Sequence, residues 1–503
     1  MTSHTTMPWG RASSTGVFAI SALAFLSGCM VGPNYTQPAA PASKQYDQQA
    51  QKQLSAAGGP IDAQRISLGQ EINGDWWSAF GSAKLDQVMH QAIGGNFDLA
   101  SADATIAQAN EAVIGARGGL YPQLDYGAEL GRQRADAGGL VKPVTASFSA
   151  AGLLLDYDFD VFGGTKRQVE RQAALADFQK RQYAAAYLTL TGDIANQAIL
   201  LASARAQMDA VETLLADDRK NLELVRSAHL IGSATQVDLA LAETQLSLDQ
   251  TLLPPLAQQY AVARHALSVL AGKGPNDWVA PDFELAEFTL PSDLPVSLPS
   301  EVARNRPDIL EAESELHAAS AAIGVATADL YPHLTLSGLV TQTAAGASSP
   351  FGTGIALWSI AAELAGPLFH GGTLKANRRG AVDGYKASLA IYRQTVVRSL
   401  GQVADVLQAI NHDAEEYSAQ DQALNSAGIS LRLNQDGYRE GEISVLQVLD
   451  AERAYQQALL GHIRAKTAQY LDTTQLFVAL GGNSAGAFER RAELCQGAPE
   501  DSK

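Results

Sequence analysis

The chain has 503 residues, of which 46% are hydrophobic and 18% are charged. This composition excludes a disordered chain and allows a large apolar core. The formal net charge is −17, from 36 basic and 53 acidic residues, which disfavours nucleic acid as a partner. The two cysteines, Cys29 and Cys495, do not form a pattern with zinc-ligand spacing.

The N-terminus predicts an exported lipoprotein. Arg11 precedes an apolar run over residues 17–26, which has the length of a signal-peptide core and is too short to span a bilayer. The run leads into a Leu-Ser-Gly-Cys motif that ends at Cys29 and resembles a bacterial lipobox. We therefore expect a signal peptide over residues 1–28, lipidation of Cys29, and an extended, proline-containing tether over residues 29–70. A plain signal peptide with a chance cysteine is the alternative.

The sequence contains a long internal repeat. Residues 120–124 (LYPQL) recur as residues 330–334 (LYPHL), an offset of 210 between Tyr121 and Tyr331 (331 − 121). A later segment, residues 232–243, aligns with residues 441–452 at an offset of 209 (441 − 232). A period of this length indicates an old duplication and not a solenoid.

Each half predicts the same order of elements, namely a helix, two strands and then two long helices. The expected domains are repeat 1 at residues 71–272, a linker at 273–300, repeat 2 at 301–482 and a flexible C-terminal tail at 483–503. The expected elements are leading helices near Phe97 to Arg117 and Asp308 to Ala328, β-hairpins over 121–162 and 331–369, and long helices over 164–271 and 372–480.

The predicted strands alternate apolar and polar residues. Leu124, Tyr126, Ala128 and Leu130 alternate with Gln123, Asp125, Gly127 and Glu129. Such alternation is typical of a wall with one apolar and one wet face, although a soluble β-layer shows it too. The sequence contains no run of about 18 apolar residues that could form a membrane helix. A pore would therefore need a β-barrel. Because a closed barrel needs about eight strands or more, we expect several chains to share one.

The long helices carry apolar residues at every seventh position, which predicts left-handed supercoiling against neighbouring helices. The positions are Tyr187, Ile194, Leu201, Met208, Leu215 and Leu222, then Leu389, Val396, Val403, Ile410, Tyr417, Leu424 and Leu431. In the first half, Pro254 and Pro255 predict an interruption of the returning helix. A generic coiled-coil dimer would account for the heptads but would leave the strands and the repeat unexplained.

Several motifs together resemble the TolC-like outer-membrane factors, specifically the NodT-type lipoprotein branch that serves resistance–nodulation–division efflux pumps. The motifs are the lipobox with Val31-Gly32-Pro33-Asn34-Tyr35, Trp76-Trp77 with Phe80, the two Tyr-Pro strand starts, Asp158 to Gly163, Arg306-Pro307-Asp308, and Gly437-Tyr438-Arg439 followed by Leu449-Asp450-Ala451. The resemblance covers nearly the whole chain, from Leu26 to about Asn483.

This resemblance implies a mixed α/β, mainly α membrane protein. It implies a homotrimer whose 12-stranded β-barrel continues into a 12-helix periplasmic α-barrel, lipid-anchored in the outer membrane of a Gram-negative bacterium. It also implies an equatorial belt, where Trp76 and Trp77 would be aromatic anchors and not a ligand-stacking surface. The residue after the cysteine is Met30 and not aspartate, which is compatible with sorting to the outer membrane.

The implied function is a passive exit duct for small molecules such as drugs. Its implied partners are a periplasmic membrane-fusion adaptor, an inner-membrane resistance–nodulation–division transporter and outer-membrane lipid. Two alternatives remain, a duct for type I protein secretion and a structural periplasmic coiled-coil lipoprotein. The amphipathic strands and the duplication disfavour the second alternative, because a tether needs neither.

The resemblance also implies a periplasmic gate at the inner ends of the second-half helices. The family's gate tyrosine corresponds to Tyr438 and its gate aspartate to Asp450, with Arg439 and Gln447 nearby. Gln447 stands where some members carry a further aspartate, and Ile443 where some carry arginine, so the latch is expected to differ. The alternative for Tyr438 and Asp450 is a tip tyrosine and a solvated carboxylate.

The turns between the long helices are small, exposed and repeated, so we expect them to contact the adaptor. The expected contact residues are Gly232, Ser233, Thr235, Gly441, Ile443 and Ser444. The sequence shows no glycine-rich phosphate loop after a strand and no nucleophile beside a base. We therefore expect neither an enzyme nor a bound cofactor or metal.

Overall fold

The computed structural model describes residues 30–43, 45–46, 64–70, 72, 74–135, 143–345 and 354–482. The predicted signal peptide, Cys29, Cys495 and the predicted C-terminal tail lie outside these residues. No helix in the described ranges combines the length and the apolar character needed to cross a membrane.

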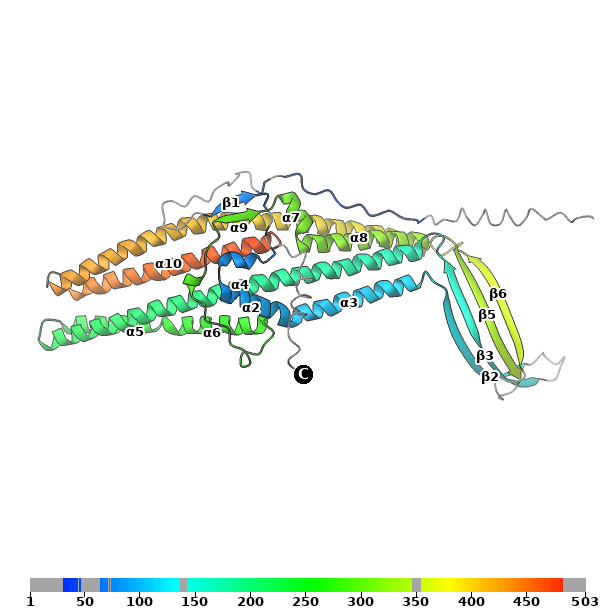
Figure 1. The fold of residues 1–503 in the computed structure, drawn as a ribbon, viewed down its shortest axis with the longest axis horizontal. Helices are drawn as coiled ribbons and strands as arrows, with labels where there is room; N and C mark the ends of the chain where they lie inside the picture. Colours follow the sequence, from blue (N-terminus) through cyan, green and yellow to red (C-terminus); the bar gives the residue numbers. More distant parts are fainter. Residues whose placement is uncertain are drawn as a thin grey trace, which may run out of the picture. The chain divides into compact units, whose positions relative to one another are not determined.

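The order of a helix, two strands and long helices occurs twice along the chain (Figure 1). In the first half the elements are α3 (Phe97–Gly118), β2 (Gln123–Ala135), β3 (Val144–Phe159), α4 (Gly164–Leu230), α5 (Gln236–Gln250) and α6 (Leu253–Leu270). In the second half they are α8 (Pro307–Ala328), β5 (His333–Ala345), β6 (Ile355–Ala365), α9 (Thr373–Arg439) and α10 (Val445–Ala479).

Six shorter elements accompany these: β1 (Arg65–Leu68), η1 (Trp76–Phe80), α2 (Ala83–Gly95), η2 (Leu285–Glu287), β4 (Asp293–Val296) and α7 (Pro299–Asn305). Strand β1 pairs in parallel with β4. The sequence predicts only an extended tether and a linker here. The two strands form because Ile66, Leu294 and Val296 bury their side chains, to 9%, 0% and 0% exposure.

The contacts divide the chain into two compact units. Unit 1 comprises residues 1–37, 106–178 and 313–391, and unit 2 comprises residues 38–105, 179–312 and 392–503. Each unit takes corresponding parts of both halves of the sequence. The two compact units therefore do not coincide with the two sequence repeats. Strands from the two halves pair with each other, and so do the long helices.

Unit 1 contains an antiparallel sheet in the order β2-β3-β5-β6. Its central pair, β3 and β5, joins the two halves of the chain. Within the described residues, β2 and β6 each pair on one side only. Many large apolar side chains on this sheet are exposed, including Tyr126, Leu130, Val340, Trp358, Ile360 and Leu364.

Unit 2 contains the paired long helices, whose heptad positions form its seam. Tyr187, Ile194, Leu201, Leu215 and Leu222 are at most 8% exposed, and Val396, Val403, Ile410 and Tyr417 are at most 9% exposed. Nine of the thirteen predicted positions are therefore buried, and the other four, Met208, Leu389, Leu424 and Leu431, are half-buried. The predicted interruption is also confirmed, since α5 ends at Gln250 and α6 begins at Leu253 with Pro254 in its first turn. Proline is tolerated there because a first-turn N–H has no partner within the helix.

Candidate functional site

The first hairpin tip joins α4 to α5 through a tight turn. The N–H of Ser233 donates to the carbonyl of Ala228 (2.9 Å), and the N–H of Gly232 donates to that of His229 (3.0 Å). This pattern satisfies the last carbonyls of the helix, and it requires the left-handed backbone that Gly232 adopts, with φ of 78°.

Thr235 then starts α5 with a reciprocal cap. The N–H of Asp238 donates to Thr235 Oγ1 (3.2 Å), and the N–H of Thr235 donates to the Asp238 carboxylate (2.8 Å). The hydrogen bonds from Thr235 lower the pKa of Asp238. Thr235, predicted as an adaptor contact, therefore also has a clear role in helix capping.

The second tip joins α9 to α10 with the same geometry. The N–H of Glu442 donates to the carbonyl of Gly437 (2.8 Å), and Gly441 has φ of 79°. Ser444 precedes α10, and its N–H donates to Gln447 Oε1 (3.1 Å). Gln447, named as a gate residue from sequence, thus caps α10. Ile443 lies over Gly437, where an added Cβ would be 3.5 Å from its side chain.

The two tips present different chemistry. Leu230 and Ile231 at the first tip are 83% and 82% exposed. The second tip instead exposes Glu440, Gly441 and Glu442. The turn residues were predicted from sequence as contacts, and the exposed apolar pair was not. Two aliphatic residues directly before a turn glycine could have indicated it.

The residues predicted to form a gate lie where α9 ends and α10 begins. Arg439 donates to Asp436 (2.7 Å), and Asp450 accepts from Arg453 (3.2 Å). Arg453 also donates to Gln245 of α5 (2.7 Å), so Asp450 belongs to a polar link between α10 and α5. Within the single described chain, no hydrogen bond joins Tyr438 to Asp450.

Residues 30–37, which we name the N-terminal strap, are held on unit 1 by a buried arginine. Arg167, at 1% exposure, donates to the carbonyl of Val31 (3.1 Å) and to Asn34 Oδ1 (2.9 Å). An added Cβ at Gly32 would lie 2.5 Å from Gly324 Cα, so the strap approaches α8 too closely for any side chain there.

The far end of the strap is fixed by aromatic stacking. The ring of Tyr35 stacks on that of His317 with centroids 4.3 Å apart, and its hydroxyl donates to Glu313 (3.2 Å). Glu170 contacts both His317 (3.0 Å) and Arg167 (2.6 Å). The strap motif is visible in the sequence, but the role of Arg167 is not, because Arg167 lies 133 residues away from its partner Asn34.

A second buried arginine joins four helices within unit 2. Arg306 follows α7 and donates to Asp308 at the start of α8 (2.9 Å) and to the carbonyl of Ala479 at the end of α10 (2.7 Å). It also donates to Gln402 of α9. The motif Arg306-Pro307-Asp308 therefore has a structural meaning, as the junction where α7, α8, α9 and α10 meet.

The tryptophans of η1 are core residues. Trp76, Trp77 and Phe80 are at most 2% exposed. Trp76 stacks on Phe477 of α10 with centroids 5.4 Å apart, and Phe80 lies 6.2 Å from the ring of Tyr470. This packing agrees with the prediction that Trp76 and Trp77 are aromatic anchors and not a ligand-stacking surface, while the equatorial belt stays a prediction.

Comparison with known proteins identifies the architecture. The model of the outer membrane efflux protein family matches residues 88–273 and 298–482. The chain belongs to the outer membrane efflux protein family. It is 30% identical over 417 residues to the pyoverdine export outer membrane protein OpmQ of Pseudomonas aeruginosa, which covers 81% of this chain and 87% of OpmQ. It is 28% identical over 468 residues to the cation efflux system protein CusC of Escherichia coli, covering 91% of this chain and 96% of CusC.

Solved structures give the same answer. The outer-membrane channel OprN superposes with a TM-score of 0.81 at 25% identity, covering 90% of this chain and 99% of OprN. The open-state MtrE channel of Neisseria gonorrhoeae superposes with a TM-score of 0.78, also at 25% identity, covering 90% of this chain and 98% of MtrE. The protein is thus an outer-membrane efflux channel, and its family consists of transport proteins and not of enzymes.

Proposed function

We propose that three copies of this chain form the exit duct of a tripartite efflux pump, with a shared 12-stranded barrel continuing into a 12-helix tunnel. A periplasmic adaptor and an inner-membrane transporter would deliver small molecules to it. The relatives' names mention pyoverdine and cations, so family membership does not say which small molecule this chain exports. The two segments matched by the family model support the proposed duplication.

One observation carries this proposal, the four-stranded sheet of unit 1. Strands β2 and β6 form its two edges in the described chain, and Tyr126 and Trp358 are 88% and 76% exposed on it. Exposed edges and exposed large apolar side chains are unfavourable in water. Pairing β2 of one copy with β6 of the next would satisfy the edges, and lipid would cover the apolar face.

The trimer is tested by the mass of the assembly. Four strands in each of three copies would give a closed 12-stranded barrel, so detergent-solubilised protein should have three times the mass of one chain by light scattering. The substitution Glu223→Gln removes a charge at an exposed helix position. It should not change this mass and serves as a control. A stable and fully folded monomer would contradict the shared barrel.

We also propose that Cys29 is the lipidated N-terminus. The strap that follows it is fixed by Arg167 next to Phe162, whose carbonyl accepts the N–H of Val31 (3.0 Å). This would hold the acyl chains near the corner between β3 and α4. Mass spectrometry of the mature protein should find acylated Cys29 as its first residue. An unmodified N-terminus at another position would refute the assignment.

The hairpin tips are proposed to dock the adaptor through Gly232, Ser233 and Thr235 on one side and Gly441, Ile443 and Ser444 on the other. An added Cβ at Gly232 or Gly441 meets nothing within 4 Å, so bulk there would project outward. Asparagine tolerates positive φ, so Gly441→Asn should only modestly reduce efflux. The bulky Gly441→Trp should abolish efflux.

Drug-accumulation assays would measure efflux, and blue native gels would measure assembly in the same cells. The tip proposal requires that Gly441→Trp lose export while the amount of trimer stays normal. Full drug resistance in this variant would remove Gly441 from the docking surface. Loss of the trimer together with export would instead assign the tip a role in folding.

A further inference from the structure

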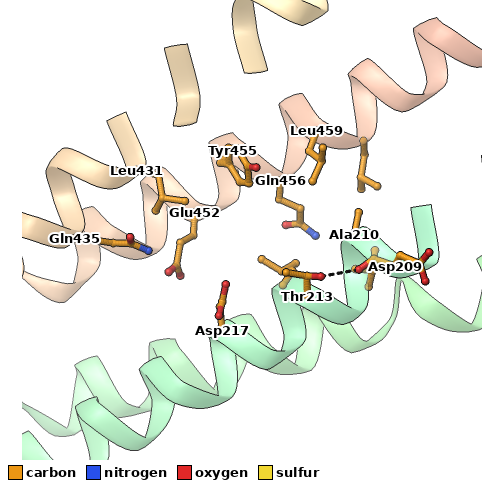
Figure 2. A pocket seen from close by; sticks show the side chains of 13 residues that line it. Asp209, Ala210, Thr213, Asp217, Leu431, Gln435, Glu452, Tyr455, Gln456 and Leu459 are labelled. Atoms are coloured by element: carbon orange, nitrogen blue, oxygen red, sulfur yellow. Dashed lines mark hydrogen bonds between the residues drawn. The ribbon is translucent and has the colours of Figure 1, made fainter. Parts of the chain in front are cut away.

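A cavity of about 300 Å³ lies within unit 2, between α4, α9 and α10 (Figure 2). Its walls are largely aliphatic and include Leu214, Leu431, Leu459 and Leu460. The ring of Tyr455 lines it as well. A volume of this size is at the lower end of those that hold small molecules, about 300–1,000 Å³.

The charged residues around this cavity all have the same sign. Asp209 and Asp217 come from α4 and Glu452 comes from α10, and none of the 13 lining residues is Lys, Arg or His. An apolar chamber whose ionisable groups are all carboxylates is complementary to a molecule that carries both apolar surface and positive charge.

Glu452 is the residue that marks the cavity as a binding site. It is 5% exposed, and its Oε1 accepts from Asn221 of α4 (2.6 Å). Its Oε2 is buried and has no partner with hydrogen-bond geometry among the described residues, and the nearby Gln435 side chain of α9 only partly offsets the rise that burial causes in the pKa of Glu452. Figure 2 shows the side chain reaching from α10 toward Asp217. A buried carboxylate oxygen without a donor is costly unless something else supplies positive charge.

The groups next to Glu452 are further buried carboxyls. Asp218 of α4 and Asp249 of α5 are both 4% exposed. Burial, followed by the neighbouring Asp249, raises the pKa of Asp218 to about 8, and burial also raises the pKa of Glu452. The nearest arginine on α10, Arg453, is already bonded to Gln245 and Asp450.

We propose that this cavity binds a small organic cation, namely an ammonium group attached to an aromatic or branched apolar body. The ammonium would face Glu452 and Asp217, the ring of Tyr455 could add a cation–π contact, and the apolar body would fill the leucine-lined space. A metal ion fits poorly, because the described residues contain no group of three or more His, Cys, Asp or Glu arranged to hold one. The cavity is not lined by the tip residues or by Tyr438 or Asp450, and the proposal does not depend on the export function.

Calorimetric titration of the detergent-solubilised, full-length assembly tests the site directly. The probe is benzyltrimethylammonium, and the matched control probe is benzyl alcohol, which keeps the ring and lacks the charge. We expect saturable binding of the ammonium at one site per chain, with affinity about tenfold higher than for the alcohol. Equal affinities, or many weak sites per chain, would overturn the proposal.

Glu452→Gln tests the residue, because the amide keeps its size and can still accept from Asn221. It should weaken ammonium binding about fivefold or more, while leaving binding of benzyl alcohol unchanged. Glu223→Gln removes the same charge from an exposed position on α4 that does not line the cavity, and it should bind like the parent. Leu459→Trp should fill the cavity and abolish binding of both probes. Normal ammonium binding in both cavity variants would locate the site elsewhere.

The binding should also depend on pH with a defined sign. A bound cation favours ionised carboxylates, and the pKa values of Glu452 and Asp218 are both raised, that of Asp218 to about 8. Affinity should therefore rise with increasing pH as these groups lose their protons. The charged groups facing them are Asp217 on α4, Asp249 on α5 and Arg453 on α10, while Gln435 from α9 is neutral. Glu452→Gln should flatten this rise, and an affinity that falls with pH would contradict the proposal.

Discussion

Replacement of Arg306 by alanine is expected to destabilise unit 2 more than most single substitutions in this chain. The guanidinium group donates to Asp308, to the carbonyl of Ala479 and to Gln402, and the residue is 8% exposed. Truncation leaves the buried carbonyl of Ala479 without this donor and removes the ion pair with Asp308, which keeps the donors Ile309 and Ser399. Leaving a buried acceptor without its donor costs about 1–3 kcal/mol, and for a unit of this size that lowers the melting temperature by roughly 5 °C.

Thermal unfolding followed by circular dichroism at 222 nm measures this loss. Arg306→Lys should fall between the parent and the alanine variant, because one ammonium group cannot reach the three partners that the planar guanidinium reaches. Arg304→Ala is the matched control, since Arg304 lies two residues earlier and is exposed. Equal melting temperatures for the Arg304 and Arg306 variants would show that this junction does not hold the helices together.

Much of the helical architecture could be predicted because the apolar residues that pack the helices together recur at regular intervals in the sequence. The seven-residue spacing of Ile194, Leu201 and their equivalents reports directly which side of a helix is buried. Pro254 and Pro255 report a helix boundary through their missing N–H groups. The pairing of β1 with β4 has no such signal, because four-residue strands carry too little pattern and their partners lie 228 residues apart (293 − 65).

The functional site was only partly predictable for a related reason. A turn glycine such as Gly441 is visible locally, because positive φ nearly demands it. Whether Gln447 forms a latch or a helix cap depends on where its side chain points, and the sequence cannot show that. Glu452 was likewise unremarkable in sequence, since its burial results from the packing of α4 and α9 against α10.

The gate proposal concerns Tyr438 and Asp450, and the structure shows how each is held within one chain. Tyr438 lies in the last turn of α9, and its carbonyl accepts the N–H of Gly441 (3.1 Å). Asp450 pairs with Arg453, which is bonded in turn to Gln245. Removing Asp450 should therefore also loosen the link from α10 to α5, and this would favour outward movement of the α9–α10 hairpin.

The double substitution Tyr438→Phe with Asp450→Ala is expected to raise single-channel conductance in planar bilayers by about twofold or more. Each hydrogen bond lost contributes only about 0.5–1.5 kcal/mol, but three copies around the duct would lose them together. Loss of three carboxylates from the constriction should also weaken the preference for cations over anions, measured as the reversal potential in a salt gradient. Glu440→Ala removes an exposed carboxylate of the same hairpin and should leave both readings near the parent values. If the double variant conducts and selects like the parent, the closure lies elsewhere on the helix ends, where Arg439 and Gln447 are the next residues to test.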